Sequence, residues 1–129
     1  MTDKKAGYPE EPHKQPFKRY VQTLDIENDP ELIEQYKHWH SPDFIWPEIP
    51  AGIKAVGILT MDISILGNRL FMIVETPLDF EWDTAFAKLS KMEKQAEWEE
   101  FVGKFQGSKP GASSTDKWQL MEKMFTLPK

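Results

Sequence analysis

The chain has 129 residues, a mass of 15.0 kDa and a net charge of −5 at pH 7. A chain of this length makes one domain, and its acidic balance argues against nucleic acid or an anionic membrane as a partner, because both bind basic patches. No apolar run approaches the ~20 residues of a membrane span, and we expect no secretory signal at the N-terminus. The sequence has no cysteine, which fits a reducing compartment such as the cytoplasm.

Residues 1–16 are rich in Pro, Lys and Glu, and we expect a flexible N-terminal tail in which His13 is solvated. Residues 17–129 are expected to form a single domain, because they contain no linker long enough to divide them. The first element of this domain is a strand over residues 17–26, which is rich in β-favouring side chains.

A helix is predicted to follow this strand. Asp29 is a suitable N-cap and Pro30 a suitable first residue. Pro42 favours an end just before it, because a residue that precedes proline avoids the α region. A second helix, short or irregular, is expected from Pro47 to about Lys54.

The middle of the chain predicts a β-hairpin. Residues 56–66 alternate as a strand, Gly67 and Asn68 supply turn residues, and residues 69–75 form a nearly continuous apolar strand. Because this second strand is apolar on both faces, we expect it to be central in a sheet and covered on each side.

Residues 77–105 have helical periodicity. Ser90 and Glu93 match a capping box, which divides the segment into two helices. A loop rich in Gly, Ser and Pro spans residues 107–117, and the alternation of residues 118–127 predicts a final strand.

The order of these elements is a βαββαβ ferredoxin-like pattern of the α+β class, with helices on one face of an antiparallel sheet. The other face of the sheet would be left bare. A second copy of the chain commonly covers such a face, so we expect a homodimer that forms a dimeric α/β-barrel.

Tyrosine, histidine and tryptophan side chains concentrate between residues 36 and 46. On the predicted helix, Tyr36 and His40 are four residues apart and share a face, whereas His38 lies roughly 200° around the helix. Imidazole has the unperturbed pKa nearest neutrality, about 6.5, so His40 beside Tyr36 is the candidate acid/base group. The alternative is that both are core residues without a catalytic role, whose hydroxyl and imidazole groups form hydrogen bonds inside the protein.

A metal site is not expected. His38 and His40 diverge on a helix and no third ligand of the same kind follows them. The sequence has no G-x-G-x-x-G, P-loop or H-E-x-x-H motif.

A set of motifs from about residue 18 to residue 128 resembles the L-rhamnose mutarotase family. The motifs are Tyr36-x-x-x-His40, Ile45-Trp46-Pro47-Glu48-Ile49, the hairpin end at 68–75, Trp98-x-x-Phe101, and the closing Ser113-Ser114, Trp118 and Phe125-x-Leu127-Pro128. The resemblance implies a cofactor-free dimer of a ferredoxin-like unit. Its substrate is a monosaccharide, because the family interconverts the α and β anomers of a deoxy-L-hexose such as L-rhamnose or L-fucose.

The resemblance also implies roles for single residues. His40 matches the acid/base histidine of the family, Tyr36 a substrate-contacting tyrosine, and Trp98 one of two tryptophans that line the sugar pocket. Glu99 stands where the family has the second tryptophan, and with Trp46 it completes the predicted substrate-binding set. Two extra residues lie between His40 and Trp46, which leaves the exact sugar open.

The reaction that the resemblance implies needs only acid/base chemistry. Mutarotation removes the proton of the anomeric hydroxyl, protonates the ring oxygen and recloses the ring on the other carbonyl face. Two other classes remain open from the residues alone. One is another enzyme of the dimeric α/β-barrel type, such as a cofactor-free monooxygenase or a haem-binding enzyme, and the other is a non-catalytic sugar-binding module.

Overall fold

The computed structural model describes residues 4–107 and 117–129. Its strands are β1 (Phe17–Asp25), β2 (Thr60–Leu66), β3 (Arg69–Pro77) and β4 (Gln119–Leu120). Its helices are α1 (Pro30–His40), α2 (Glu48–Ala55), α3 (Trp82–Leu89) and α4 (Gln95–Gln106), preceded by the 3-10 turn η1 (Lys4–Ala6). No helix in these two ranges is long and apolar enough to cross a membrane.

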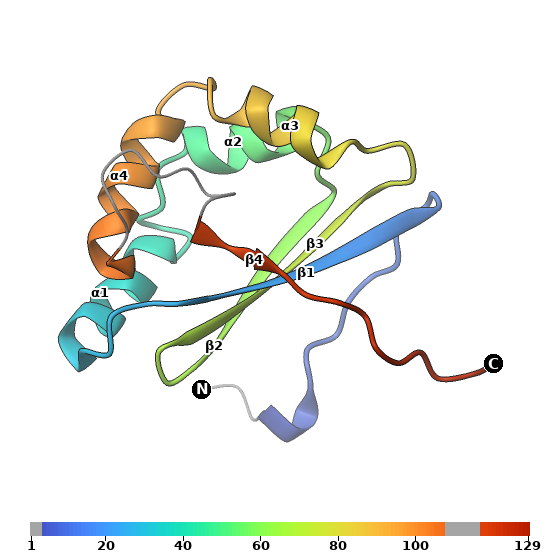
Figure 1. Cartoon of the computed structure of the whole chain (residues 1–129), viewed down its shortest axis with the longest axis horizontal. Coiled ribbons are helices and arrows are strands. Elements are labelled where there is room, and N and C mark those ends of the chain that lie inside the picture. Colours follow the sequence, from blue (N-terminus) through green and yellow to red (C-terminus); the bar gives the residue numbers. More distant parts are fainter. Residues whose placement is uncertain (1–3, 108–116) are drawn as a thin grey trace.

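The strands form one antiparallel sheet in the order β2-β3-β1-β4. β1 pairs with β3 along its whole length, from Phe17 opposite Pro77 to Asp25 opposite Arg69. The four helices gather on one side of this sheet (Figure 1). The fold is therefore α+β and ferredoxin-like, as the order of elements predicted.

β3 shows how the sheet divides the molecule into an inner and an outer face. Leu70, Met72 and Val74 are buried on the inner face, against the helices. Phe71 and Ile73 point to the outer face, where Ile73 is 38% exposed. The prediction of a central strand is confirmed, but within one chain only the inner face of that strand is fully covered.

The start of α1 follows the predicted capping chemistry. The Asp29 carboxylate accepts hydrogen bonds from the backbone N–H groups of Glu31 and Leu32, at 2.9 and 3.3 Å. Pro30 occupies the first helical position, where a missing N–H has no consequence. The short helix expected after Pro47 is also present, as α2.

The capping box predicted at Ser90 is wrong, although two helices do occupy this segment. Ser90 is the C-cap of α3, and its hydroxyl donates to the Ala87 carbonyl oxygen at 2.7 Å. This bond satisfies a carbonyl that the end of the helix leaves without a partner. α4 begins only at Gln95, after Lys94 in the left-handed region at φ 67°.

The predicted final strand is much shorter than its pattern indicated. Gln119 and Leu120 pair with β1, and the Met121 N–H donates to the Val21 carbonyl oxygen at 2.8 Å. Residues 122–129, here named the C-terminal arm, then leave the body of the molecule (Figure 1). The alternation predicts a face that must be buried, but the apolar side chains of this segment remain exposed in the described part of one chain. The loop predicted at 107–117 lies almost wholly outside the described residues.

His13 is not solvated as predicted. Its Nε2 lies 2.9 Å from Oε1 of Glu75 on the outer face, and its ring packs edge-on against Phe17 with centroids 4.7 Å apart. The Arg19 guanidinium binds the other oxygen of Glu75 at 2.6 Å. The end of the segment before β1 is therefore held on the sheet by a partly buried polar cluster.

Candidate active site

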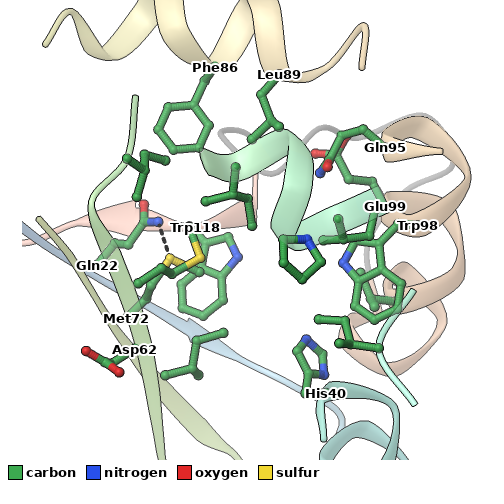
Figure 2. A pocket seen from close by; sticks show the side chains of 18 of the residues that line it. Gln22, His40, Asp62, Met72, Phe86, Leu89, Gln95, Trp98, Glu99 and Trp118 are labelled. Atoms are coloured by element: carbon green, nitrogen blue, oxygen red, sulfur yellow. Dashed lines mark hydrogen bonds between the residues drawn. The ribbon is translucent and has the colours of Figure 1, made fainter. Parts of the chain in front are cut away.

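A cavity of about 540 Å³ lies between the helices and the inner face of the sheet. Figure 2 shows its walls: His40 enters from α1, Gln95, Trp98 and Glu99 from α4, and Gln22 and Met72 from the sheet. Tyr36 also lines the cavity. The structure thus brings together His40, Tyr36, Trp98 and Glu99 from the predicted set.

The His40 imidazole is held in one tautomer by its own helix. Its Nδ1 lies 2.7 Å from the backbone carbonyl oxygen of Tyr36. A carbonyl only accepts hydrogen bonds, so Nδ1 carries the hydrogen and, in the neutral ring, Nε2 carries a lone pair. Burial lowers the pKa of His40 and the bond to the carbonyl partly opposes this shift. The ring is therefore neutral at neutral pH, with a free base nitrogen.

Tyr36 is a protonated acid beside this base. Its ring centroid lies 4.2 Å from that of His40, and the side chain is buried. Burial raises the pKa of Tyr36 to about 12, against a smaller lowering by a hydrogen bond from Gln106. The Gln106 amide donates to the Tyr36 hydroxyl at 3.2 Å. The phenol accepts this bond, so its own proton remains available for another acceptor.

The two predicted tryptophans occupy different places. Trp98 lines the cavity and meets His40 edge to face, with ring centroids 5.2 Å apart. Trp46 does not line the cavity. It packs edge to face on Trp98 at 5.2 Å and stacks on Phe101 at 5.4 Å. Trp46 therefore supports the cavity wall that Trp98 forms.

Glu99 lies next to Trp98 on α4, is buried and lines the cavity. Its backbone carbonyl oxygen accepts a hydrogen bond from Lys117 Nζ at 2.7 Å. Lys117 also lines the cavity, so the chain that enters β4 closes this side of the site.

His38 lies outside the cavity, as its helical position predicted. Its side chain is exposed, and its ring packs on Phe44 with centroids 4.1 Å apart. Among the residues that the structure describes, no group of three or more His, Cys, Asp or Glu side chains is placed to hold a metal ion.

Three glutamines and one tryptophan in the cavity wall were missed from the sequence: Gln22, Gln95, Gln106 and Trp118. A signal for two of them exists. Gln95 and Gln106 occupy the same helical stripe as Trp98 and Val102, where an apolar side chain is usual. An amide at such a position indicates a polar cavity under the helix.

A ferredoxin-like α+β unit whose cavity pairs a neutral histidine with a protonated tyrosine, beside a tryptophan wall, has the features of a small acid/base enzyme. The family model for L-rhamnose mutarotase matches residues 19–127. The chain belongs to the L-rhamnose mutarotase family.

Three proteins are similar to this chain in sequence or in structure. An L-fucose mutarotase from Xanthomonas campestris pv. campestris is 31% identical over 111 residues, which cover 86% of this chain and 89% of that protein. A UPF0734 protein from Dictyostelium discoideum is 40% identical over 91 residues, covering 70% and 71% of the two chains. The crystal structure of an L-rhamnose mutarotase from Formosa agariphila shares the fold, with a TM-score of 0.61 at 20% identity over 86% of this chain and 99% of that one.

Proposed function

We propose that this chain is a mutarotase that interconverts the α and β anomers of a 6-deoxy-L-hexose, L-rhamnose or L-fucose, with His40 as base and Tyr36 as acid. Membership of a mutarotase family makes the chain an isomerase of sugar anomers. The observation that carries the residue assignment is the bond from His40 Nδ1 to the Tyr36 carbonyl, which leaves Nε2 as a free base in the cavity.

Ring opening uses both groups at once. Nε2 of neutral His40 removes the proton of the anomeric hydroxyl, and the C1–O bond of that hydroxyl becomes a carbonyl. The bond between C1 and the ring oxygen breaks, and the ring oxygen takes the proton of the Tyr36 hydroxyl. The products are the open-chain aldehyde, an imidazolium and a phenolate, so the net charge of the site does not change.

Reclosure reverses these proton transfers on the other face of the aldehyde. Rotation about the C1–C2 bond presents that face, the phenolate takes back the proton of the sugar hydroxyl as it attacks C1, and the imidazolium protonates the new anomeric oxygen. The 4.2 Å separation of the Tyr36 and His40 rings favours the transient pair of opposite charges. Acid/base assistance of this kind contributes typically about 10²–10⁴-fold.

The remaining predicted residues serve binding in this proposal. The face of Trp98 offers an apolar platform for the sugar ring, and Trp46 holds that platform in place. The buried Glu99 carboxyl beside it suits the polar edge of a sugar, because carboxylate oxygens accept hydrogen bonds from hydroxyl groups.

We further propose a homodimer that buries the outer face of the sheet. The centre of that face is apolar, with Val21, Phe71 and the 38% exposed Ile73. Ion pairs flank the centre, among them that of Arg69 with Asp25 at 2.7 Å. An apolar centre with a polar rim is the usual anatomy of an interface.

The C-terminal arm supports the same assembly. Its side chains include Met124, Phe125 and Leu127, which are 91%, 67% and 76% exposed. Exposed apolar side chains that lie close together in this way mark a contact with another protein surface, here a second copy of the chain.

A cytoplasmic location fits the absence of cysteine from the sequence.

The test is saturation-transfer NMR of anomer exchange with L-rhamnose, L-fucose, L-mannose, L-galactose and D-glucose. We expect the protein to accelerate exchange of at least one of the two 6-deoxy-L-hexoses well above its spontaneous rate. A protein that binds these sugars but leaves every exchange rate at the spontaneous value would be a binding module, and the proposal would fail.

A further inference from the structure

Gln95, the first residue of α4, carries a buried amide oxygen that has no hydrogen-bond partner. The residue is 6% exposed and lines the cavity. In residues 4–107 and 117–129, only Gln95 and Gln106 have such an unpaired side-chain atom, and both lie on α4 in the wall of this one cavity. Unpaired buried oxygens destabilise a folded protein, so each one in a native structure requires an explanation.

The backbone in front of Gln95 carries a second unfavourable feature. Lys94 has a φ of 67°, and it is the only residue other than glycine with a positive φ in the described part of the chain. Such a conformation is strained for a lysine, and strained residues gather at functional sites. The turn at Lys94 starts α4 at Gln95, which puts the amide at one end of the cavity wall.

The position of Gln95 relative to the proton-transfer groups follows from the helix geometry. Trp98, whose ring meets His40 at 5.2 Å, is three residues further along α4, a rise of about 4.5 Å. Gln106, which binds the Tyr36 hydroxyl, is at the opposite end of the helix. Figure 2 shows His40 and Gln95 at separate edges of the cavity, with Trp98 between them along that wall.

A sugar that lies on Trp98 with its anomeric carbon at His40 therefore turns its far edge toward Gln95. In a six-membered sugar ring, C4 is the carbon across the ring from C1. We propose that Gln95 is a specificity-determining residue whose amide forms a hydrogen bond with the C4 hydroxyl of the sugar. The inference rests on the proposed mutarotase function and goes further, because it names the part of the substrate that the site reads.

The amide is suited to this role. Its oxygen accepts from a hydroxyl, and rotation about its last bond offers the NH₂ group as a donor instead. L-rhamnose and L-fucose have opposite configurations at C4, so one amide in a fixed place does not meet both hydroxyls equally well. A site that contains a buried polar group rejects a substrate that leaves that group unpaired. Gln95 therefore contributes to the choice between the two sugars.

The experiment compares kcat/KM for the preferred sugar and for its 4-deoxy and 3-deoxy analogues, each rate being divided by the spontaneous rate of the same compound. The proteins are the wild type, Gln95→Met, which keeps an unbranched side chain of similar length, and Gln35→Met as a control on the exposed side of α1. We expect kcat/KM of the wild type to be roughly tenfold lower for the 4-deoxy analogue than for the parent sugar. For Gln95→Met, kcat/KM for the parent sugar should be roughly tenfold below the wild-type value. It should then equal kcat/KM of the same variant for the 4-deoxy analogue.

Two further readouts separate recognition from a structural role. The ratio of parent to 3-deoxy rates should be the same in the wild type and in Gln95→Met, and Gln35→Met should match the wild type throughout. Thermal melting of Gln95→Met should give a Tm equal to or above that of the wild type, because its removed oxygen has no partner to lose.

Equal slowing of the parent and 4-deoxy sugars by Gln95→Met would overturn the inference, as would a change confined to the 3-deoxy analogue. If the variant did not fold, the wild type alone would decide, because equal kcat/KM for parent and 4-deoxy sugar refutes the contact. Absence of acceleration for every hexose would instead overturn the proposed function, and this assignment with it.

Discussion

Replacement of His40 by asparagine should abolish most of the activity while leaving the fold intact. The Asn side-chain NH₂ occupies nearly the place of Nδ1 and keeps a donor for the Tyr36 carbonyl, whose bond to His40 is 2.7 Å long. The variant lacks the base nitrogen Nε2 and, with the rest of the ring, the contacts of His40 with Tyr36 and Trp98. Loss of an acid/base group costs about 10²–10⁴-fold, which corresponds to about 2.7–5.4 kcal/mol of transition-state stabilisation at 1.36 kcal/mol for each tenfold.

The pH profile of the wild type should report the same group. Burial lowers the pKa of His40 below its ordinary value of about 6.5. The exchange rate should therefore be constant above this value and fall only at more acidic pH, as His40 becomes protonated. The free energy of unfolding has the same sign of dependence: the unfolded chain binds the proton first, so stability decreases as pH falls from above about 6.5 through the lowered pKa. His40→Asn should remove both effects.

The assay is saturation-transfer NMR on L-rhamnose and L-fucose for the wild type, His40→Asn and the matched control His38→Asn on the exposed face of α1. Sugar binding by His40→Asn should persist and its stability should lie within about 1 kcal/mol of the wild type. Exchange by His40→Asn within threefold of the wild-type rate would refute the assignment of His40 as the base. An equal loss of exchange rate in His40→Asn and His38→Asn would mean that both substitutions act by disturbing helix α1 and not by removing a base from the cavity.

Tyr36→Phe should slow anomer exchange by roughly 10²-fold, because it removes the proton donor. The wild-type exchange rate should stay constant up to about pH 10, since burial raises the pKa of Tyr36 to about 12. A loss of wild-type activity at lower alkaline pH would contradict this role of Tyr36. Asp29→Ala should lower the free energy of unfolding by about 1 kcal/mol in urea melts, through loss of the cap on α1, with native protein still active. Light scattering should give a particle of twice the 15.0 kDa chain mass. Deletion of residues 122–129 should shift the measured mass toward that of a single chain. A monomeric full-length protein would contradict the proposed interface.

Features governed by short-range rules were predictable from the sequence. The cap at Asp29 and the hairpin turn at Gly67 depend on residues within a few positions of each other, and both are present in the structure. The common face of Tyr36 and His40 follows from a spacing of four, and it also separates His40 from His38. The candidate base was identified for this reason.

Features that depend on contacts between distant segments were not predictable. Trp46 is only six residues from His40, but whether it faces the cavity is decided by Trp98 and Phe101, which are more than fifty positions away. The start of α4 depends on the strained turn at Lys94, and no capping pattern indicates that residue. The length of the final strand was overestimated. Alternation of apolar and polar residues indicates that one face is buried, but it does not indicate whether the same chain or another chain covers that face.

The bond between His40 and the Tyr36 carbonyl has a consequence for reversibility. Many catalytic histidines are oriented by a carboxylate, which raises their basicity. Here the orienting group is an uncharged main-chain oxygen of the same helical turn. The imidazole therefore gains no basicity from a charged partner, and burial lowers its pKa. The imidazolium that forms when the ring opens thus gives its proton back readily when the ring recloses. Because no side chain supplies the acceptor, a point substitution elsewhere leaves the tautomer unchanged for as long as this turn of the helix holds.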